Sequence, residues 1–564
     1  MKHKHKLWLQ KVYSSTYVAP LAAAMGGGLL FVIIYGWGIL DPTNVSWLAN
    51  QGDLTQHYLG WEFFRQSEWS MPIGRIGDLA YPSGTSIVYM DAIPIAAIFF
   101  KSIQFILPAT FQYFGWWGLI SFMLQASLAA LILKRFTSST VHSVLGSMLV
   151  VLAPTLMARM FQHTALASQW VILLAILLVV YRSTYMYSWW KSILIWSGMF
   201  VLAVGIHPYF VIMVGAFFAS YLILTYRGAL LTAAHVVVAV GATAGFFWLI
   251  GGTVAKNVAT VNLGMYGADL NSLFNPIGYS YFLRSLPTIP GAYEGMAFLG
   301  LGVYILALMA LGSIIFSRPI SLRLSSKNFK SFASKHSRKI FACLPIIGIF
   351  LLAVGPVVYA NGHQILVLTL PTPIAESLSV FRSTGRFTWA VSYLAMLLAV
   401  ILVIRLKGGS RWGVTLVMSA ALMVQFIDVS RATPVRQRVG MVRHSQVQKN
   451  PYDTKVIERL FEGKQHAVYT QYTFPGTEFF NLGEIIVERD MTINNGYISR
   501  KTDSLVKNSV EASSRELGMM QLRNDTVYIT SDSLDVQKAM RSPDRPSIVS
   551  VRQGEWLIAT KHEP

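Results

Sequence analysis

The sequence predicts an all-α polytopic membrane domain over residues 1–430, followed by an α/β domain outside the membrane over residues 431–564. Hydrophobic residues make up 54% of the chain and charged residues only 13%, whereas globular domains carry roughly a quarter charged residues. Apolar runs long enough to cross a bilayer recur up to residue 430. Beyond that residue no such run occurs, and short β-like and helical segments alternate instead.

We expect about eleven transmembrane helices, because a helix that crosses the hydrocarbon core needs about twenty apolar residues. The expected spans are 18–40, 114–133, 141–158, 166–181, 189–206, 209–226, 229–250, 297–316, 340–359, 387–404 and 412–429. The first span contains the run Gly26–Gly28, which predicts close packing against a neighbouring helix.

The distribution of basic residues predicts the orientation. The segments placed in the cytoplasm contain Lys and Arg but no Asp or Glu: 1–17, 134–140, 182–188, 227–228, 317–339 and 405–411. Cytoplasmic loops of membrane proteins are enriched in Lys and Arg. The N-terminus is therefore predicted inside, on a retained first helix rather than a cleaved signal. The loops 41–113, 251–296 and 360–386 and the C-terminal tail then face outward.

One further apolar run, residues 86–107, does not fit as a span. It contains Asp91, Pro94 and Lys101, and counting it as transmembrane would invert the bias in basic residues. We therefore predict an interfacial or re-entrant helix on the outer side.

The tail shows the alternation of a small α/β domain. The expected strands are 466–470, 526–530, 547–551 and 556–560, and the expected helices are 454–461, 503–519 and 534–540.

Composition also narrows the partners and cofactors. The net charge of +20 is explained by the basic cytoplasmic loops, so the lipid bilayer is the expected partner and nucleic acid is not. Cys343 is the single cysteine, which excludes a disulfide framework and a cysteine-based metal site. No metal-binding motif occurs. A divalent cation held by Asp53, Asp91 and Glu294 is the one cofactor left open, although carboxylates in outer loops are common without an ion.

The strongest candidate for chemistry is the stretch Gly52–Tyr58, just after the first span. Asp53 and His57 are four residues apart and share one face of a helical turn. An aromatic, amphipathic piece follows up to Arg65. Asp53 is either a catalytic carboxylate or a helix cap, and His57 either acts in a site or packs on the helix.

Other polar residues gather at predicted outer span ends. Arg382 and Arg386 are spaced by four, as are Arg159 and His163. Outer arginines run against the usual bias and suit a phosphate, which guanidinium binds bidentately, although they could be interfacial anchors. Candidate pocket residues are Asp91, His163, His207, Tyr209, Tyr293 and Glu294. Asp91 could instead bond to loop backbone, His207 could end a helix, and Glu294 could belong to a turn.

The arrangement resembles the GT-C superfamily of membrane glycosyltransferases. The similarity lies in a first span, an outer loop with an acidic residue near its start, two interfacial helices, and a span ending in the basic pair Lys134-Arg135. Two patterns resemble an uncharacterised bacterial branch of that group: Gly-Asp-x-x-Gln-His-Tyr-x-Gly-Trp-x-Phe-Phe-Arg (52–65) and Phe-Arg-Ser-x-Gly-Arg-Phe (381–387). The resemblance covers residues 10–430.

The resemblance implies inverting transfer of a sugar from a polyprenyl-phosphate donor to an acceptor hydroxyl on the outer face of a bacterial cytoplasmic membrane. The acceptor would be a cell-envelope glycan of the O-antigen or teichoic-acid kind. Asp53 would be the general base and His57 its orienter or an acceptor contact. Arg382, Arg386 and Arg159 would bind the donor phosphate.

Three other functions remain open. A lipid-linked polysaccharide polymerase or ligase shares the donor, but such enzymes generally use a large late outer loop, whereas here the first loop is the richest. A transporter or flippase predicts charges and broken helices near the bilayer midplane, whereas these charges lie at span ends. A non-catalytic scaffold with a binding tail is the third.

Overall fold

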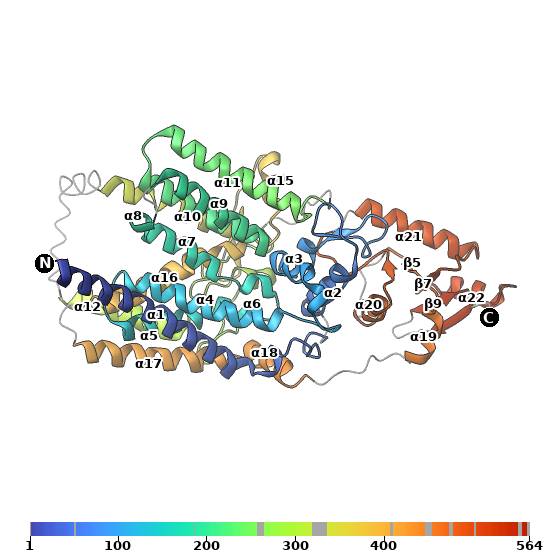
Figure 1. The fold of residues 1–564 in the computed structure, drawn as a ribbon, viewed down its shortest axis with the longest axis horizontal. Coiled ribbons are helices and arrows are strands. Elements are labelled where there is room, and N and C mark those ends of the chain that lie inside the picture. Colours follow the sequence, from blue (N-terminus) through green and yellow to red (C-terminus); the bar gives the residue numbers. More distant parts are fainter. Residues whose placement is uncertain are drawn as a thin grey trace. The chain divides into compact units, whose positions relative to one another are not determined.

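The structure is a computed structural model, drawn in Figure 1. It describes residues 2–49, 52–185, 188–255, 264–317, 336–406, 410–445, 454–472, 478–500, 503–550 and 555–560. The residues 318–335, which hold most of the predicted basic loop 317–339, lie outside this description. The chain forms two compact units. Unit 1 comprises residues 1–40, 114–243 and 259–443, and unit 2 comprises residues 41–113, 244–258 and 444–564.

Unit 1 is built from apolar helices. Those that coincide with predicted spans are α1 (Lys2–Tyr35), α4 (Phe114–Lys134), α5 (Thr140–Val151), α7 (Trp170–Val180), α9 (Trp189–Ile206), α10 (Tyr209–Thr225), α11 (Ala229–Leu249), α12 (Leu301–Ser317), α14 (Leu344–Val354), α16 (Trp389–Ile404) and α17 (Arg411–Ser430). Among the described residues, seven helices are long and apolar enough to cross a membrane, and four shorter apolar helices coincide with the remaining predicted spans.

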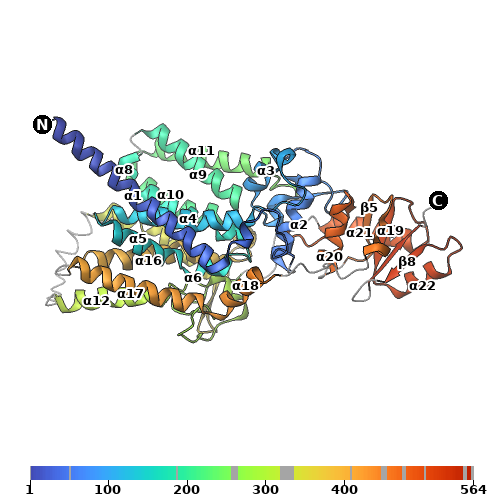
Figure 2. The same ribbon diagram turned by 60° about the horizontal axis from the view of Figure 1, so that its bottom comes forward.

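Close helix packing in unit 1 is visible between α1 and α4, which run side by side in Figures 1 and 2. A Cβ atom at Gly27 would lie 2.7 Å from the carbonyl oxygen of Phe122. Only a residue without a side chain allows this approach, which confirms the packing predicted for Gly26–Gly28.

Two predicted spans end early. The span expected at 340–359 stops at Val354 because Gly355 has a φ of +78° and Pro356 follows it. The chain then forms an antiparallel hairpin of a half-buried strand, β3 (Val357–Ala360), and an exposed strand, β4 (His363–Val367). The span expected at 141–158 is divided into α5 and the short helix α6 (Pro154–Arg159), since Pro154 has no N–H to continue a helix.

The boundary predicted at residue 430 also shifts. Helix α18 (Thr433–Arg443) packs on α1, α6 and α17, with Val435 and Val442 buried. Unit 1 therefore extends to Arg443. The loop 41–113, which we predicted to face outward and assigned to the membrane domain, is grouped with the tail in unit 2.

The first-loop part of unit 2 contains α2 (Asp53–Gln66), the two-residue strands β1 (Arg75–Ile76) and β2 (Thr85–Ser86), and α3 (Pro94–Ser102). Residues 86–107 form α3 flanked by two 3-10 turns, η2 (Ile87–Met90) and η3 (Gln104–Ile106), none of which is long enough to span.

The buried ammonium group of Lys101, on α3, donates to the carbonyl oxygens of Phe64 and Ser67 at 2.6 Å each. Burial lowers the pKa of Lys101 to about 8. This lysine thereby satisfies carbonyl groups at the C-terminal end of α2.

The tail of unit 2 contains a five-stranded sheet with the order β6-β5-β7-β9-β8. Its strands are β5 (His466–Tyr469), β6 (Thr492–Ile493), β7 (Thr526–Thr530), β8 (Ser547–Ser550) and β9 (Trp556–Ala559). β5 is parallel to β6 and β7, and β9 is antiparallel to β7 and β8. The helices are α19 (Thr454–Phe461), α20 (Glu478–Glu488), α21 (Asp503–Gly518) and α22 (Ser533–Arg541). All seven segments expected in the tail are confirmed, while β6 and α20 were not predicted.

Candidate functional site

Helix α2 carries the first candidate cluster, in unit 2. Asp53 is the first residue of this helix and Gly52 is its N-cap, so the predicted capping alternative does not describe the position. The Asp53 carboxylate is partly exposed and its Oδ1 accepts a hydrogen bond of 3.2 Å from the Tyr497 hydroxyl. A carboxylate in the first turn is stabilised by the partial positive charge of the helix N-terminus.

His57 lies one turn further along α2 and is completely buried, with a side-chain exposure of 0%. Its Nε2 is 3.3 Å from Oδ2 of Asp91. Asp91 closes the 3-10 turn η2 with a left-handed φ of 54°. Such a conformation is uncommon for a residue with a Cβ and recurs at functional sites. The structure therefore gives His57 a carboxylate partner, Asp91, that we had predicted only as a separate pocket residue.

Tyr497 is a site residue that sequence reasoning missed. It lies in the loop after β6, a strand that is hydrogen-bonded to residues 78–81 of the loop 41–113. The Ile493 N–H donates to the Asp78 carbonyl at 2.8 Å, and the Tyr81 N–H donates to the Ile493 carbonyl at 2.9 Å. Tyr497 lies four residues after Ile493, and its hydroxyl donates to the Asp53 carboxylate. No local pattern around residue 497 indicates this role.

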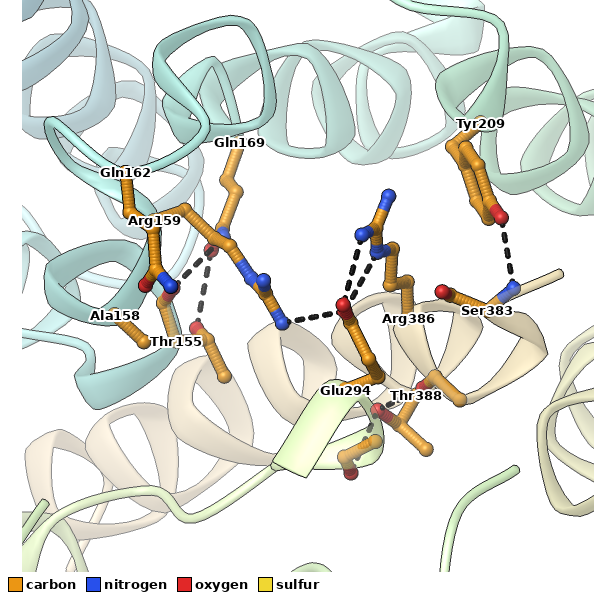
Figure 3. Close-up of polar contacts among 12 residues, drawn as sticks. Thr155, Ala158, Arg159, Gln162, Gln169, Tyr209, Glu294, Ser383, Arg386 and Thr388 are labelled. Atoms are coloured by element: carbon orange, nitrogen blue, oxygen red, sulfur yellow. Dashed lines mark hydrogen bonds and ion pairs between the residues drawn. The ribbon is translucent and has the colours of Figure 1, made fainter. Parts of the chain in front are cut away.

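The second candidate cluster lies within unit 1 and is centred on Glu294 (Figure 3). Glu294 belongs to the 3-10 turn η5 (Pro290–Gly295), Arg159 ends α6, and Arg386 lies in the 3-10 turn η6 (Thr384–Thr388). Arg159 Nη2 is 2.7 Å from Glu294 Oε2. Arg386 Nε and Nη2 donate to Oε2 and Oε1 at 2.8 and 3.0 Å.

The electrostatics of this cluster follow from its burial. All three side chains are at most 8% exposed. Burial alone would raise the pKa of Glu294, but Arg386 and Arg159 outweigh it and hold that pKa well below its usual range. His163, in the loop after α6, acts in the same direction. Two guanidinium groups on one carboxylate leave the cluster with a formal charge of +1, which suits an anion.

The predicted pair Arg382 and Arg386 has two different environments. Arg382 is exposed and stacks on the Tyr266 ring at 5.0 Å, whereas Arg386 is buried and stacks on the Tyr209 ring at 4.8 Å. The reason is local, since the regular turn begins only at Thr384. The two arginines are therefore not on one face of a continuous helix, although their spacing by four would allow it.

The remaining pocket candidates of unit 1 are Tyr209, His207 and Tyr293. The Tyr209 hydroxyl accepts from the Ser383 N–H at 2.9 Å, as Figure 3 shows. His207 is the C-cap of α9, and its Nδ1 accepts from the Tyr209 N–H at 3.3 Å. His207 thus ends α9, as the alternative interpretation predicted, and its side chain contacts the first residue of α10. The ring of Tyr293 is 45% exposed and lies 6.3 Å from the ring of Tyr266.

Two points bear on the divalent cation that the sequence left open. Both oxygens of Glu294 accept from guanidinium groups, so Glu294 would have to leave its arginines to bind a metal ion. Asp269, a further carboxylate of unit 1, accepts from the backbone N–H groups of Asn361 and Gly362 at 3.1 and 3.0 Å. That carboxylate serves to hold the β3–β4 hairpin.

The chain was compared with known protein families and with characterised proteins. The family described as "Domain of unknown function (DUF6311)" matches residues 23–430, and the "DUF6311 C-terminal domain" matches residues 457–559. No curated protein matches the chain.

Proposed function

We propose, for a chain that belongs to the DUF6311 family, that it is a membrane glycosyltransferase using a polyprenyl-phosphate sugar donor. The acceptor would be a hydroxyl of a cell-envelope glycan on the outer face of a bacterial cytoplasmic membrane. The observation that carries the proposal is Asp53, a partly exposed carboxylate at a helix N-terminus with a hydroxyl donor on one oxygen. The predicted outer orientation and the GT-C resemblance support it.

The chemistry assigned to Asp53 is general base catalysis. The carboxylate accepts the proton of the acceptor hydroxyl as that oxygen attacks the anomeric carbon. The bond from the anomeric carbon to the phosphate oxygen breaks, and the polyprenyl phosphate leaves with the electron pair. Attack opposite to the leaving group inverts the anomeric configuration. A phosphate is a good leaving group, so no strong general acid is needed.

The pair His57–Asp91 suits a supporting role. His57 is buried, its Nε2 lies 3.3 Å from Oδ2 of Asp91, and it projects from the same helix as Asp53, one turn away. A buried imidazole fixed by a carboxylate keeps a defined orientation. We assign it to holding the first turn of α2 and the bound acceptor in place.

The cluster around Glu294 is our candidate for the donor phosphate. Its formal charge of +1 comes from two arginines, and guanidinium binds phosphate bidentately. Arg382 is exposed and lies four residues before Arg386, and it would add a second cationic contact to the phosphate. In this proposal the phosphate competes with Glu294 for the guanidinium N–H groups.

The direct test uses membranes containing the full chain, supplied in turn with polyprenyl-phosphate-linked hexoses, and follows release of polyprenyl phosphate. Asp53→Asn should lower the transfer rate by about 10²–10⁴-fold, the usual contribution of a general base. Asp41→Asn is the matched control, because Asp41 lies exposed in the same loop and its carboxylate accepts from the N–H and the hydroxyl of Thr43, two residues away. Undiminished transfer by Asp53→Asn would refute the assignment.

A further inference from the structure

We propose that Tyr497 is a positioning residue for Asp53, and that the C-terminal domain thereby forms an integral part of the catalytic unit. This inference rests on the proposed function, because it assigns to the domain a task in that same reaction. It differs from the view of the tail as a separate binding module joined to a membrane enzyme.

The first observation is the contact itself. The Tyr497 hydroxyl donates to Asp53 Oδ1 at 3.2 Å, although the two residues are 444 positions apart. A carboxylate on a single Cβ rotates about its last side-chain bond with little resistance. A hydroxyl donor on one oxygen fixes that rotation, and with it the direction of both oxygens. A base whose lone pair already points at the acceptor proton loses less entropy in the transition state.

The second observation is that the segment around Tyr497 is itself held firmly. The side-chain amide of Asn494 bonds both backbone groups of Tyr469, accepting from its N–H at 2.8 Å and donating to its carbonyl at 3.1 Å. The Gly496 N–H donates to Asn495 Oδ1 at 2.9 Å. The Tyr497 ring packs on Phe480 with centroids 5.3 Å apart. The hydroxyl is therefore presented by a rigid support, as precise positioning requires.

The third observation is the place of this segment in the sheet. β5 lies between β6 and β7 and is parallel to both. The chain passes from β5 to β6 on one side and then from β6 to β7 on the other side of β5, so the direction of strand addition reverses here. The carboxyl ends of parallel strands near such a reversal are common ligand sites. Tyr497 follows the carboxyl end of β6 by four residues, at the same edge of the sheet as the carboxyl ends of β5 and β7.

The fourth observation is that the first outer loop continues this structure. Leu79 forms a parallel β-bridge with Ile493, and the Ser499 N–H donates to the Tyr89 carbonyl at 3.1 Å. Tyr497 lies between these two attachments. The loop that carries Asp53 and the domain that carries Tyr497 are thus joined by backbone hydrogen bonds on both sides of the contact, within one compact unit.

The experiment compares Tyr497→Phe with Tyr528→Phe in the full chain. Both remove only a hydroxyl, and Tyr528 donates to a different carboxylate of the same domain, Glu516 Oε2, at 2.8 Å. Transfer from a polyprenyl-phosphate-linked hexose, thermal unfolding and the split between kcat and KM are measured for each variant.

We expect Tyr497→Phe to lower kcat by about 10- to 100-fold, the worth of a hydrogen bond to a charged group. KM for the donor should stay within about two-fold, since donor binding is not affected. Tyr528→Phe should keep nearly full activity. Unchanged kcat for Tyr497→Phe overturns the inference. So does a fall that accompanies equal loss of thermal stability in both variants, because that would mark a structural role.

Asp53→Asn separates this inference from the function it rests on. Full transfer by Asp53→Asn refutes the proposed base, and the role of Tyr497 falls with it. Loss of transfer by Asp53→Asn together with full transfer by Tyr497→Phe leaves the proposed function standing and refutes only the positioning role.

Discussion

Asp53 and Glu294 are two carboxylates in very different settings. Asp53 is partly exposed, lies at the N-terminus of α2 in unit 2, and receives a neutral hydroxyl donor. Glu294 is 2% exposed in unit 1 and receives two guanidinium groups. The first carboxylate keeps solvent access, whereas the second has both oxygens occupied by cations from distant segments.

This difference separates chemical from structural roles. A general base must be reached by the proton it accepts, and Asp53 meets that requirement. A buried ion cluster satisfies its own charges and joins the segments that supply them. Glu294 joins the end of α6 to η6 through Arg159 and Arg386, and it thereby stabilises unit 1. A bound phosphate would replace part of the contact between Glu294 and the two arginines.

The largest expected effect tests this separation through stability. Glu294→Gln removes the negative charge and leaves two buried arginines without a counter-ion, which should cost about 3–5 kcal/mol of unfolding free energy. Asp53→Asn should cost about 1 kcal/mol or less, because only a partly exposed hydrogen bond is altered. Thermal or denaturant unfolding in detergent measures both. Equal destabilisation by the two substitutions would remove the distinction.

Arg386→Lys should have the next largest effect. Lysine cannot reproduce the two N–H donors that Arg386 directs at both oxygens of Glu294. If the cluster binds the donor phosphate, KM for the donor should rise by roughly ten-fold. Arg436→Lys is the matched control, since Arg436 is exposed on α18 outside the cluster and should change KM by about two-fold or less. A KM unaffected by Arg386→Lys would contradict the phosphate assignment.

A smaller effect is expected from Glu62, nine residues after the start of α2. Burial raises the pKa of Glu62 to about 8; Arg65 opposes the shift, and Glu488 and Glu484 on α20 add to it. The neutral carboxyl is therefore favoured in the folded state. Its contribution to stability is fully present below the usual glutamate pKa and is lost as the pH rises through about 8.

Thermal unfolding near pH 6 and near pH 9 measures this loss, which we expect as a decrease of a few degrees at the higher pH. Glu62→Gln should remove that part of the pH dependence, because the amide does not titrate. Glu68→Gln, at an exposed position just after the same helix, should leave it intact. The same pH profile in wild type and Glu62→Gln would disprove the assignment.

Much of the fold followed from local patterns. Each predicted span coincides with an apolar helix, and the tail segments lie within a residue or two of their expected bounds. The elements that escaped prediction are short or interrupted. β6 has two residues, and α20 contains Gly483, which lowers helix propensity. The β3–β4 hairpin was hidden because its apolar residues continue the run of α14.

The sites were predictable only as a set of residue types. Polar residue types in the loops and at the ends of predicted spans singled out Asp53, His57, Arg159, Glu294 and Arg386, and Asp91 stood out inside an apolar run. Their grouping was not predictable. We assigned Glu294 and the arginines to separate tasks, whereas the structure joins them, and we overlooked Tyr497 entirely.

The sequence by itself determined the membrane domain, the helices within it and the α/β tail, because hydrophobic runs and strand alternation act between neighbours along the chain. Only the tertiary structure decided which charges pair and which domain reaches Asp53. Arg159 and Glu294 are 135 residues apart, and Asp53 and Tyr497 are 444 apart. Contacts over such separations depend on how helices and sheet pack, and no local pattern records them. Asp53, just after the first predicted span, therefore receives its hydroxyl donor from Tyr497 in the C-terminal domain.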